Sequence, residues 1–420
     1  MQRPLLFAGA AIVGGLAFSA QAAAAEDISC GLSNGQVASG EPIVLGAIVG
    51  KTGPDDFSAS AMAADAYFEC VNANGGINGR PIRYIIGDDQ WNPEVAAQLA
   101  AKIVQDENAV AMVGNSSFVE CAANAKLYAD SNIVAVSGVG VPRECFSASN
   151  IAPTNAGPRI SSTAAAEFAG EQLGAKNIVC IGPNIPNVGA WSCEGVVKWG
   201  EANGVTANTI LIDPGSLDAT SVVLQAASFG ADSVVLGLPK GIMLPILTAA
   251  EEQGFDQTMN WLSAASGYDT TVPGTLGAVW EGKFYVNMEF NPLDSEESDN
   301  RNWLAVMDKY AEPENPRDTF AQAGYLAARV VTDALLSLDP ADINRDSVTA
   351  ALSRVDNFQS DILCATWYVG AEQPRQNANH TTRMAVTAGD TWKTVTDCRP
   401  SEDVELADII AYEKEAGIAN

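Results

Sequence analysis

The stretch from residue 68 to residue 93 constrains the fold more than any other part of the chain, and its sequence is FECVNANGGINGRPIRYIIGDDQWNP. An apolar helical run ends at Asn74-Gly75-Gly76, because glycine adopts the left-handed conformation of a helix C-terminus without steric cost. Asn78-Gly79 predicts a tight turn. A short strand over residues 81–86 then leads into an acidic loop at Gly87-Asp88-Asp89. Ligands of open parallel sheets bind beyond this end of the strands, so the stretch predicts a site there.

Apolar strands alternate with longer helical segments along most of the chain, which predicts the α/β class with parallel sheets and right-handed crossovers. In the first half we expect strands at residues 43–49, 82–87, 109–113 and 133–137, and helices at 58–72, 93–106 and 120–130. Residues 149–158 interrupt the rhythm, and it then restarts. The second half predicts strands at 178–181, 207–212, 233–237 and 259–263, and helices at 162–173, 193–204, 221–229 and 242–253.

Two similar halves predict two doubly wound parallel-sheet lobes with a cleft between them, joined by a multi-strand hinge that permits closure on a ligand. We expect further helices at residues 302–311 and 319–338, a strand at 284–290, and a two-stranded piece at 364–369 and 383–387. The chain is expected to cross between lobes near 281–290 and 352–364. The predicted domains are a first lobe (42–148 and 284–350), a second lobe (149–283 and 351–400) and a C-terminal tail (401–420).

Residues 1–25 combine an Arg, an apolar core and a run of small residues ending in repeated Ala-x-Ala, which predicts a secretory signal peptide. The mature protein is therefore expected to be exported, periplasmic or otherwise extracytoplasmic. The formal net charge of −28 disfavours nucleic acid and anionic membranes as partners.

All eight cysteines lie beyond the predicted signal peptide, and an even number in an exported chain favours disulfides. Pairing of neighbours in the sequence is expected, because each bond would then join adjacent βα units or one hairpin, although the sequence leaves other connectivities open. The expected bonds are Cys30–Cys70, Cys121–Cys145, Cys180–Cys193 and Cys364–Cys398. No C-x-x-C motif is present, which argues against structural zinc.

The sequence contains few residues or motifs that are typical of enzyme active sites. The single histidine, His380, lies in a polar stretch and is expected to be a solvated loop residue, so a Ser-His-Asp triad has no evident base. The Asp55-Asp56 and Asp88-Asp89 pairs suit loop ends and helix caps better than glycosidase chemistry. We therefore expect binding without catalysis, no metal and no cofactor.

The chain resembles the type I periplasmic solute-binding proteins of branched-chain amino acid ABC transporters, the Leu/Ile/Val-binding-protein-like family, from about residue 43 to residue 397. The resemblance is carried by Thr52-Gly53-Pro54, the stretch 72–81, Gly87-Asp88-Asp89 with Pro93, Val113-Gly114, and residues 377–395. It implies an extracytoplasmic, monomeric binding component that closes on a small solute in its cleft and delivers that solute to the permease subunits of an importer.

The loops that hold an amino acid in this family differ here. The resemblance places Phe118 and Val141 where relatives have Ser and Thr, and Ala264, Ala265 and Ser266 where relatives have an acidic residue. The tyrosines that relatives offer from the second lobe are replaced near Val188 and Pro239. A buried ammonium without partners would cost several kcal/mol, so a hydrophobic or aromatic acid is expected in place of a free α-amino acid.

The ligand-binding candidates divide by chemistry. Ser116 and Ser117 are hydrogen-bond donors, and Lys240 is a cation for a carboxylate, with a solvated loop cation as the alternative. The apolar and aromatic candidates, whose tryptophans could instead pack within a lobe, are Phe57, Trp91, Phe118, Val141, Trp191 and Tyr268. Three other functions stay open: an amide, urea or amino acid binder if the loop alignment has slipped, a secreted enzyme on a similar frame, and a ligand-sensing receptor domain.

Overall fold

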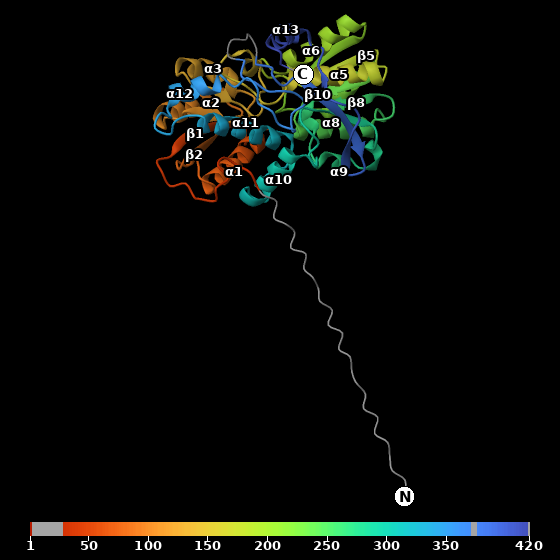
Figure 1. Ribbon diagram of the computed structural model, residues 1–420. Coiled ribbons are helices and arrows are strands. Elements are labelled where there is room, and N and C mark those ends of the chain that lie inside the picture. Colours follow the sequence, from red (N-terminus) through yellow and green to blue (C-terminus); the bar gives the residue numbers. More distant parts are fainter. Residues whose placement is uncertain (2–27, 371–375, 419–420) are drawn as a thin grey trace.

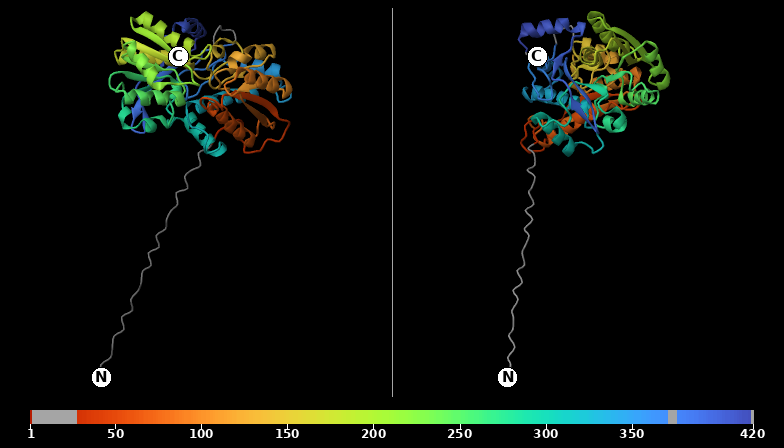
Figure 2. Two further views of the ribbon diagram at one scale, coloured as in Figure 1. Left: turned by 180° about the vertical axis from the view of Figure 1, so that it is seen from behind. Right: turned by 90° about the vertical axis from the view of Figure 1, so that its right-hand side faces the viewer.

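The computed structural model of this 420-residue chain describes residue 1, residues 28–370 and residues 376–418 (Figure 1). The predicted signal peptide, apart from its first residue, lies outside the described residues. Two α/β units stand side by side in Figure 1 and in the left view of Figure 2, one built around each of two sheets. The predicted fold class is confirmed.

The first sheet is parallel throughout, with strand order β2-β1-β3-β4. Its strands are β1 (Ile43–Val49), β2 (Ile82–Asp88), β3 (Ala111–Val113) and β4 (Ala135–Val136). Six of the seven residues of β1 are buried, as expected for a parallel strand with both faces covered. The helices of this unit are α1 (Ala59–Ala73), α2 (Pro93–Ala101), α3 (Glu120–Asp130), α4 (Glu144–Ser147), α10 (Ser298–Tyr310), α11 (Thr319–Leu336) and α12 (Arg345–Leu352).

Helix α1 ends as its sequence predicts. Asn74 is its C-cap, and Gly76 has a φ of +57°. A β-carbon at Gly76 would lie 2.4 Å from the carbonyl oxygen of Arg80, so both the conformation and the close approach require glycine. Helix α2 was predicted to run to residue 106, and the last turn of that range is a π-helical segment, Lys102–Asp106.

The second sheet has the order β11-β10-β9-β8-β7-β5-β6, with β12 paired to β10. Its parallel strands are β5 (Asn177–Pro183), β6 (Thr206–Ile212), β7 (Ser233–Leu236), β8 (Asn260–Ser263) and β9 (Phe284–Met288). Antiparallel strands complete it, namely β10 (Thr381–Ala388), β11 (Thr391–Thr394) and β12 (Arg399–Pro400). Its helices are α5 (Gly157–Gln172), α6 (Gly189–Asn203), α7 (Ala219–Ser228), α8 (Lys240–Glu252), α9 (Val272–Leu276) and α13 (Ala407–Ala416).

The structure places two segments differently from the predicted domains. Strand β9 was assigned to the first lobe, but it pairs with β8 and β10 in the second sheet, so the chain crosses after β9. Residues 351–369 were assigned to the second lobe, yet Phe358, Leu363 and Trp367 pack in the core that α1 and α11 share. The predicted strand at 364–369 is reduced to one bridge between Phe358 and Trp367, and β10 pairs with β9 and β11 in its place.

All four predicted disulfides are present: Cys30–Cys70, Cys121–Cys145, Cys180–Cys193 and Cys364–Cys398. The first three join neighbouring parts of one unit, whereas Cys364–Cys398 ties the segment after α12 to the region of β12 in the second sheet. The pairing of cysteines adjacent in the sequence is therefore confirmed.

The C-terminal segment is folded onto the second unit and is not a loose tail. The Arg159 guanidinium, 2% exposed, lies 2.9 Å from Asp403 through its Nε atom, and Arg159 Nη1 donates to the carbonyl of Trp191. His380 was expected in solvent, but it is 1% exposed and its Nε2 lies 3.0 Å from the Glu413 carboxylate of α13. The sequence around His380 is polar, but the residue is buried because α13 covers it. Within the described residues, every helix is too short or too polar to serve as a membrane span.

Candidate functional site

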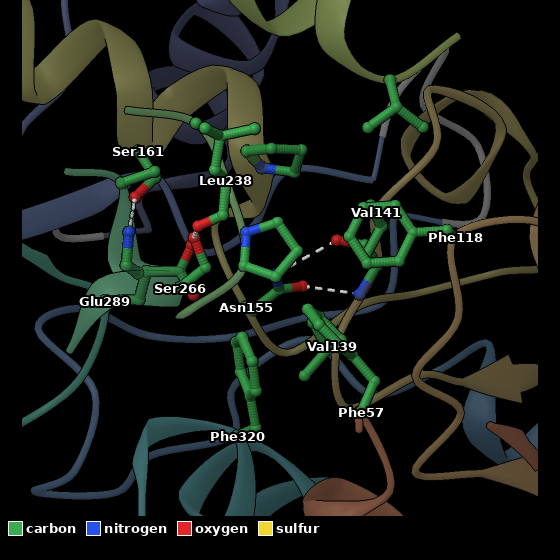
Figure 3. A pocket seen from close by; sticks show the side chains of 17 residues that line it. Phe57, Phe118, Val139, Val141, Asn155, Ser161, Leu238, Ser266, Glu289 and Phe320 are labelled. Carbon is green, nitrogen blue, oxygen red and sulfur yellow. Dashed lines mark hydrogen bonds between the residues drawn. The ribbon is translucent and has the colours of Figure 1, made fainter. Parts of the chain in front are cut away.

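Loops from the carboxyl ends of both sheets meet around one cavity (Figure 3). The space between the lining atoms is about 430 Å³, part of which is open to solvent. The first sheet contributes Phe57, Phe118, Val139, Gly140 and Val141, and α11 contributes Phe320. The second unit contributes Asn155, Pro158, Ser161, Val188, Gly237, Leu238, Pro239, Ala264, Ala265, Ser266 and Glu289.

Aromatic rings form the wall on the side of the first sheet. Phe57 meets Phe118 edge to face with centroids 4.8 Å apart, and Phe320 lies 5.0 Å from Phe57. Behind them, Trp91 stacks on Phe118 at 4.1 Å with an interplanar angle of 14°. Aromatic pairs of this geometry are worth about 0.5–1.5 kcal/mol beyond the area they bury, so the wall is held rigid.

The loop after β2 holds Trp91 in place. Trp91 has a φ of +59°, an unusual conformation for a bulky residue, and its backbone N–H donates to Asp89 Oδ1 at 2.8 Å. Its indole Nε1 donates to the carbonyl of Asp55 at 3.2 Å. A β-carbon at Gly53 would lie 2.8 Å from the Trp91 ring, which explains glycine at this turn.

The acidic pair at the end of β2 organises loops. Asp88 accepts hydrogen bonds from the backbone of Lys51 and Thr52 and from the Thr52 hydroxyl. Although partial burial opposes the effect, these hydrogen bonds hold the pKa of Asp88 below its usual value. Asp89 is fully buried and accepts from the Ser117 hydroxyl, and burial raises its pKa to about 6. Neither aspartate lines the cavity.

Three helices of the second unit begin at the cavity. Helices α5, α6 and α8 have Ala156, Val188 and Pro239 at their N-caps, and none of the three has a side-chain capping hydrogen bond. The first backbone N–H groups of a helix lack partners within it and carry partial positive charge. This side of the cavity therefore favours a negatively charged ligand group.

The polar side chains of the lining are satisfied, with one exception. Asn155 exchanges two hydrogen bonds with the backbone of Gly140, which Figure 3 shows as dashed lines. Ser161 Oγ donates to Asn287 Oδ1 and accepts from the N–H of Ala265, and Ser266 Oγ donates to the carbonyl of Leu238.

Glu289, just beyond β9, is the exception. Its Oε1 accepts from the N–H of Gly157 at 3.0 Å, while its Oε2 is buried and has no partner among the described residues. Burial raises the pKa of Glu289 to about 8, against the opposing effects of Gly157 and of the nearby Asn155 amide. At neutral pH this carboxyl is therefore mostly protonated.

Loops of the two units also contact each other beside the cavity. Asn187 accepts from the N–H of Arg143 at 2.9 Å, and its amide donates to Glu144 Oε1. The rings of Phe146 and Trp191 lie 5.7 Å apart. The units are thus in contact around the cavity, which is the arrangement that a closed cleft requires.

The structure separates the predicted site residues into three groups. Phe57, Phe118 and Val141 line the cavity, and Trp91 supports it from behind. Lys240 and Tyr268 line an adjoining cavity that shares Phe57, Ser266 and Phe320 with the first, and Lys240 pairs there with Asp269 at 2.6 Å. The remaining three candidates, which line neither cavity, are Ser116, Ser117 and Trp191.

Those three have other environments. Ser117 accepts from the backbone N–H groups of Val119 and Glu120 at the start of α3. Trp191 donates to Glu405 and lies under the Arg159 guanidinium. Ser116 bridges β1 and the loop after β4, and its buried hydroxyl has no partner among the described residues.

Several lining residues were not among the predicted site residues, and those with polar or aromatic side chains include Asn155, Ser161, Glu289 and Phe320. A signal for Glu289 was present, because it lies at the end of the predicted strand 284–290, and the ends of parallel strands carry sites. Asn155 and Phe320 lie at a crossover and at a helix start, which carry no such signal. Among the described residues, no group of three or more His, Cys, Asp or Glu side chains is placed to hold a metal ion.

Two α/β units that close their strand ends around a shared cavity define a two-lobed binding protein. The chain belongs to the periplasmic binding protein family, whose sequence profile matches residues 42–391. It is 35% identical over 79 residues to the chemotactic signal transduction system substrate-binding protein BasB of Halobacterium salinarum. The matched stretch is 18% of this chain and 19% of that protein. The chain matches only about a fifth to a quarter of the length of its curated relatives.

Solved structures show the same fold. A fatty acid ABC transporter substrate-binding protein from Thermomonospora curvata has a TM-score of 0.76 at 18% identity, over 90% of this chain and 97% of the other. A solute-binding protein from Rhodopseudomonas palustris in complex with p-hydroxybenzoic acid has a TM-score of 0.74 at 17% identity, over 87% and 100%. A leucine binding protein from Thermotoga maritima has a TM-score of 0.71 at 16% identity, over 85% and 99%.

Proposed function

We propose that this protein is the exported substrate-binding component of an ABC importer, and that it captures a hydrophobic or aromatic acid in the cleft between its lobes. Closure brings the loops of both sheets onto the ligand, and the closed form delivers it to the permease subunits. A monomer suffices for this role, because both walls of the cavity come from one chain. The role is binding and release, without chemical change of the ligand.

The observation that carries this proposal is the composition of the cavity. Rings of Phe57, Phe118 and Phe320 and the side chains of Val141 and Leu238 surround it. Burial of apolar ligand surface against such walls supplies roughly 25 cal/mol per Å². The starts of α5, α6 and α8 provide partial positive charge for one carboxylate, although Glu289 already accepts from Gly157 on α5 and Asp55 from Gly241 on α8.

A free α-amino acid suits the cavity less well. Its ammonium needs an ionised carboxylate, and the loop after β8 offers Ala264, Ala265 and Ser266. Glu289 is the carboxyl in the lining, and burial raises its pKa to about 8, so an ammonium would have to ionise it first. The similar folds of a fatty acid ABC transporter substrate-binding protein and of a solute-binding protein in complex with p-hydroxybenzoic acid support an acid, whereas the leucine binding protein keeps the amino acid alternative open.

A thermal-shift screen tests the proposal, because a ligand that binds only the folded state raises the melting temperature. The mature protein is screened against benzoate, 4-hydroxybenzoate, octanoate, leucine, urea and glucose, and hits are measured by isothermal titration calorimetry. We expect shifts with the acids and none with leucine. A shift with leucine alone would overturn the proposed ligand class.

A sensory role is the second candidate, and the similarity to BasB favours it, although that similarity covers a fifth of each protein. Deletion of the gene separates the two roles. Loss of uptake of the radiolabelled acid supports an importer, and loss of chemotaxis with uptake intact supports a sensor.

A further inference from the structure

One atom of the cavity lining is left for the ligand. The side chains of Asn155, Ser161 and Ser266 all have partners within the protein. Glu289 Oε2 is the side-chain polar atom of the described lining residues that is buried without a partner. Because unpaired buried polar atoms are rare and costly, this atom points to a partner that the protein itself does not supply.

The other carboxyl oxygen is fixed. Glu289 Oε1 accepts from the N–H of Gly157, the first residue of α5, and Asn379 donates to the backbone carbonyl of Glu289. The side chain is 2% exposed. Its orientation is therefore set before any ligand arrives. Oε2 makes no hydrogen bond of good geometry, although the Asn155 amide and the Ala156 N–H lie close enough to the carboxyl to lower its pKa.

The charged groups on the elements packed around Glu289 are directed elsewhere, although Arg383 Nε is buried without a partner. Arg159 on α5 pairs with Asp403, and His380 before β10 contacts Glu413. Arg383 on β10 points its Nη2 at the sulfurs of Cys364 and Cys398. No cation among the described residues faces the Glu289 carboxyl, so burial disfavours its ionised form.

We propose that Glu289 is the residue that selects acids, and that its neutral carboxyl donates a hydrogen bond from Oε2 to one carboxylate oxygen of the bound ligand. This inference rests on the proposed function, because it takes an acid as the ligand. The proton stays on Glu289 and no covalent bond changes. The hydrogen bond is charge-assisted, which makes it about twice as strong as one between neutral groups. An ionised Glu289 would repel the same ligand.

Capture is then coupled to one proton. The free protein holds that proton below the pKa of Glu289, which burial raises to about 8. Above this pH, binding of the anion must first return a proton to Glu289, so the affinity falls by about tenfold per pH unit. An ionised Glu289 that accepted a hydrogen bond from a ligand ammonium or hydroxyl would give the opposite dependence.

The experiment is calorimetric titration of the mature protein with benzoate and with octanoate from about pH 6 to about pH 9, a range in which both probes stay ionised. Each pH is measured in two buffers of different ionisation enthalpy, which reports proton uptake directly. For the wild-type protein we expect weaker binding and uptake of one proton at the alkaline end. Affinity that is constant or rises with pH would overturn the inference.

Glu289→Gln is the decisive variant, because the amide has the same shape and keeps a donor at every pH. We expect it to bind benzoate at the alkaline end as well as at neutral pH, without proton uptake. Glu167→Gln is the matched control, since Glu167 is another buried glutamate of raised pKa, about 7, outside the cavity. It should keep the pH dependence of the wild type. The same dependence in Glu289→Gln would overturn the inference.

The two proposals fail differently. If both acids bind but neither the pH nor Glu289→Gln matters, the proposed function stands and the role of Glu289 is wrong. If neither acid binds at any pH while leucine does, the proposed ligand class is wrong, and the role of Glu289 falls with it.

Discussion

The Asp55 carboxylate, in the loop after β1, accepts a hydrogen bond of 2.9 Å from the backbone N–H of Gly241 at the start of α8. The two residues are 186 positions apart in the sequence and belong to opposite units. An anion at a helix N-terminus is stabilised by the unpaired amides and the helix dipole. The contact therefore favours the closed cleft directly, outside the ligand cavity.

Asp55→Ala should weaken ligand binding without unfolding the protein. The variant removes one hydrogen bond that exists only when the units are together, so the dissociation constant should rise by roughly twofold to tenfold. Calorimetry gives the affinity, and thermal denaturation without ligand gives the stability. Asp56→Asn is the control, because asparagine still accepts from the N–H of Ser58, and it should bind like the wild type. Equal affinity of Asp55→Ala and wild type would show that the contact is irrelevant to closure.

Phe118→Ala should lower both stability and affinity. It removes the ring that Trp91 stacks on and that Phe57 contacts, so the free energy of unfolding should fall by about 3 kcal/mol. Binding of benzoate should weaken at the same time. The control is Phe229→Ala, because Phe229 is 40% exposed. Its free energy of unfolding should change by no more than about 0.5 kcal/mol. Urea denaturation measures the free energy of unfolding of both variants. Similar losses in the two variants would contradict the assigned role of Phe118.

Stability should fall as pH rises from about 5 to about 8. Burial raises the pKa of Glu120 and Glu167 to about 7 and that of Glu289 to about 8. Between the unfolded and the folded pKa, the folded state keeps a proton that the unfolded state releases, so acid favours folding. Each group contributes at most about 1.4 kcal/mol per pH unit. Denaturant titrations across this range test the sign, and Glu167→Gln should flatten the slope. Rising stability would refute the assignment.

Lys240→Ala should cost less affinity for an acid than Glu289→Ala does. The Lys240 ammonium already pairs with Asp269 and lies in the adjoining cavity, so we expect a loss of less than about threefold. Loss of the Glu289 donor should cost about tenfold or more. Calorimetry with benzoate compares the two variants. A larger loss in Lys240→Ala would assign the carboxylate to Lys240, as the sequence predicts.

A disulfide that encloses a longer stretch of chain should stabilise the protein more than one that encloses a shorter stretch. Cys30 and Cys70 are 40 residues apart, and Cys180 and Cys193 are 13 apart. Restriction of the unfolded chain predicts losses of about 4 and about 3 kcal/mol when each pair is replaced by alanine. Guanidinium denaturation of the two double variants measures the difference. The reverse order would mean that contacts in the folded state, and not chain entropy, dominate.

Most of the fold was predictable because its signals are local. The strand Ile43–Val49 and the helix Glu120–Asp130 agree with the prediction residue for residue, since apolar runs and helix ends are set by nearby residues. The sheet to which β9 belongs was not predictable in this way. Its antiparallel pairing with β10 joins residues 95 to 101 positions apart, and the alternation pattern carries no information about such distant partners.

The site was predictable on the side of the first sheet and less so on the other. Phe57, Phe118 and Val141 follow strands of regular spacing, and the rule for strand ends locates them. Trp91 and Ser117 follow strands too, yet they face into the loop structure, because side-chain direction depends on the turn that each loop adopts. The unpaired oxygen of Glu289 could not be predicted, because it depends on which hydrogen bonds the other lining residues make.

The Arg159 and Asp403 side chains meet across 244 residues of chain. Arg159 lies in the first turn of α5, at the cavity, whereas Asp403 belongs to the last folded segment. Until the segment around Asp403 docks on α5, the Arg159 guanidinium lacks this buried counterion and has the half-exposed Glu194 carboxylate as its partner. The second lobe therefore completes its packing only when this late segment docks, and a chain truncated before Asp403 would leave the buried Arg159 guanidinium without its most buried carboxylate partner.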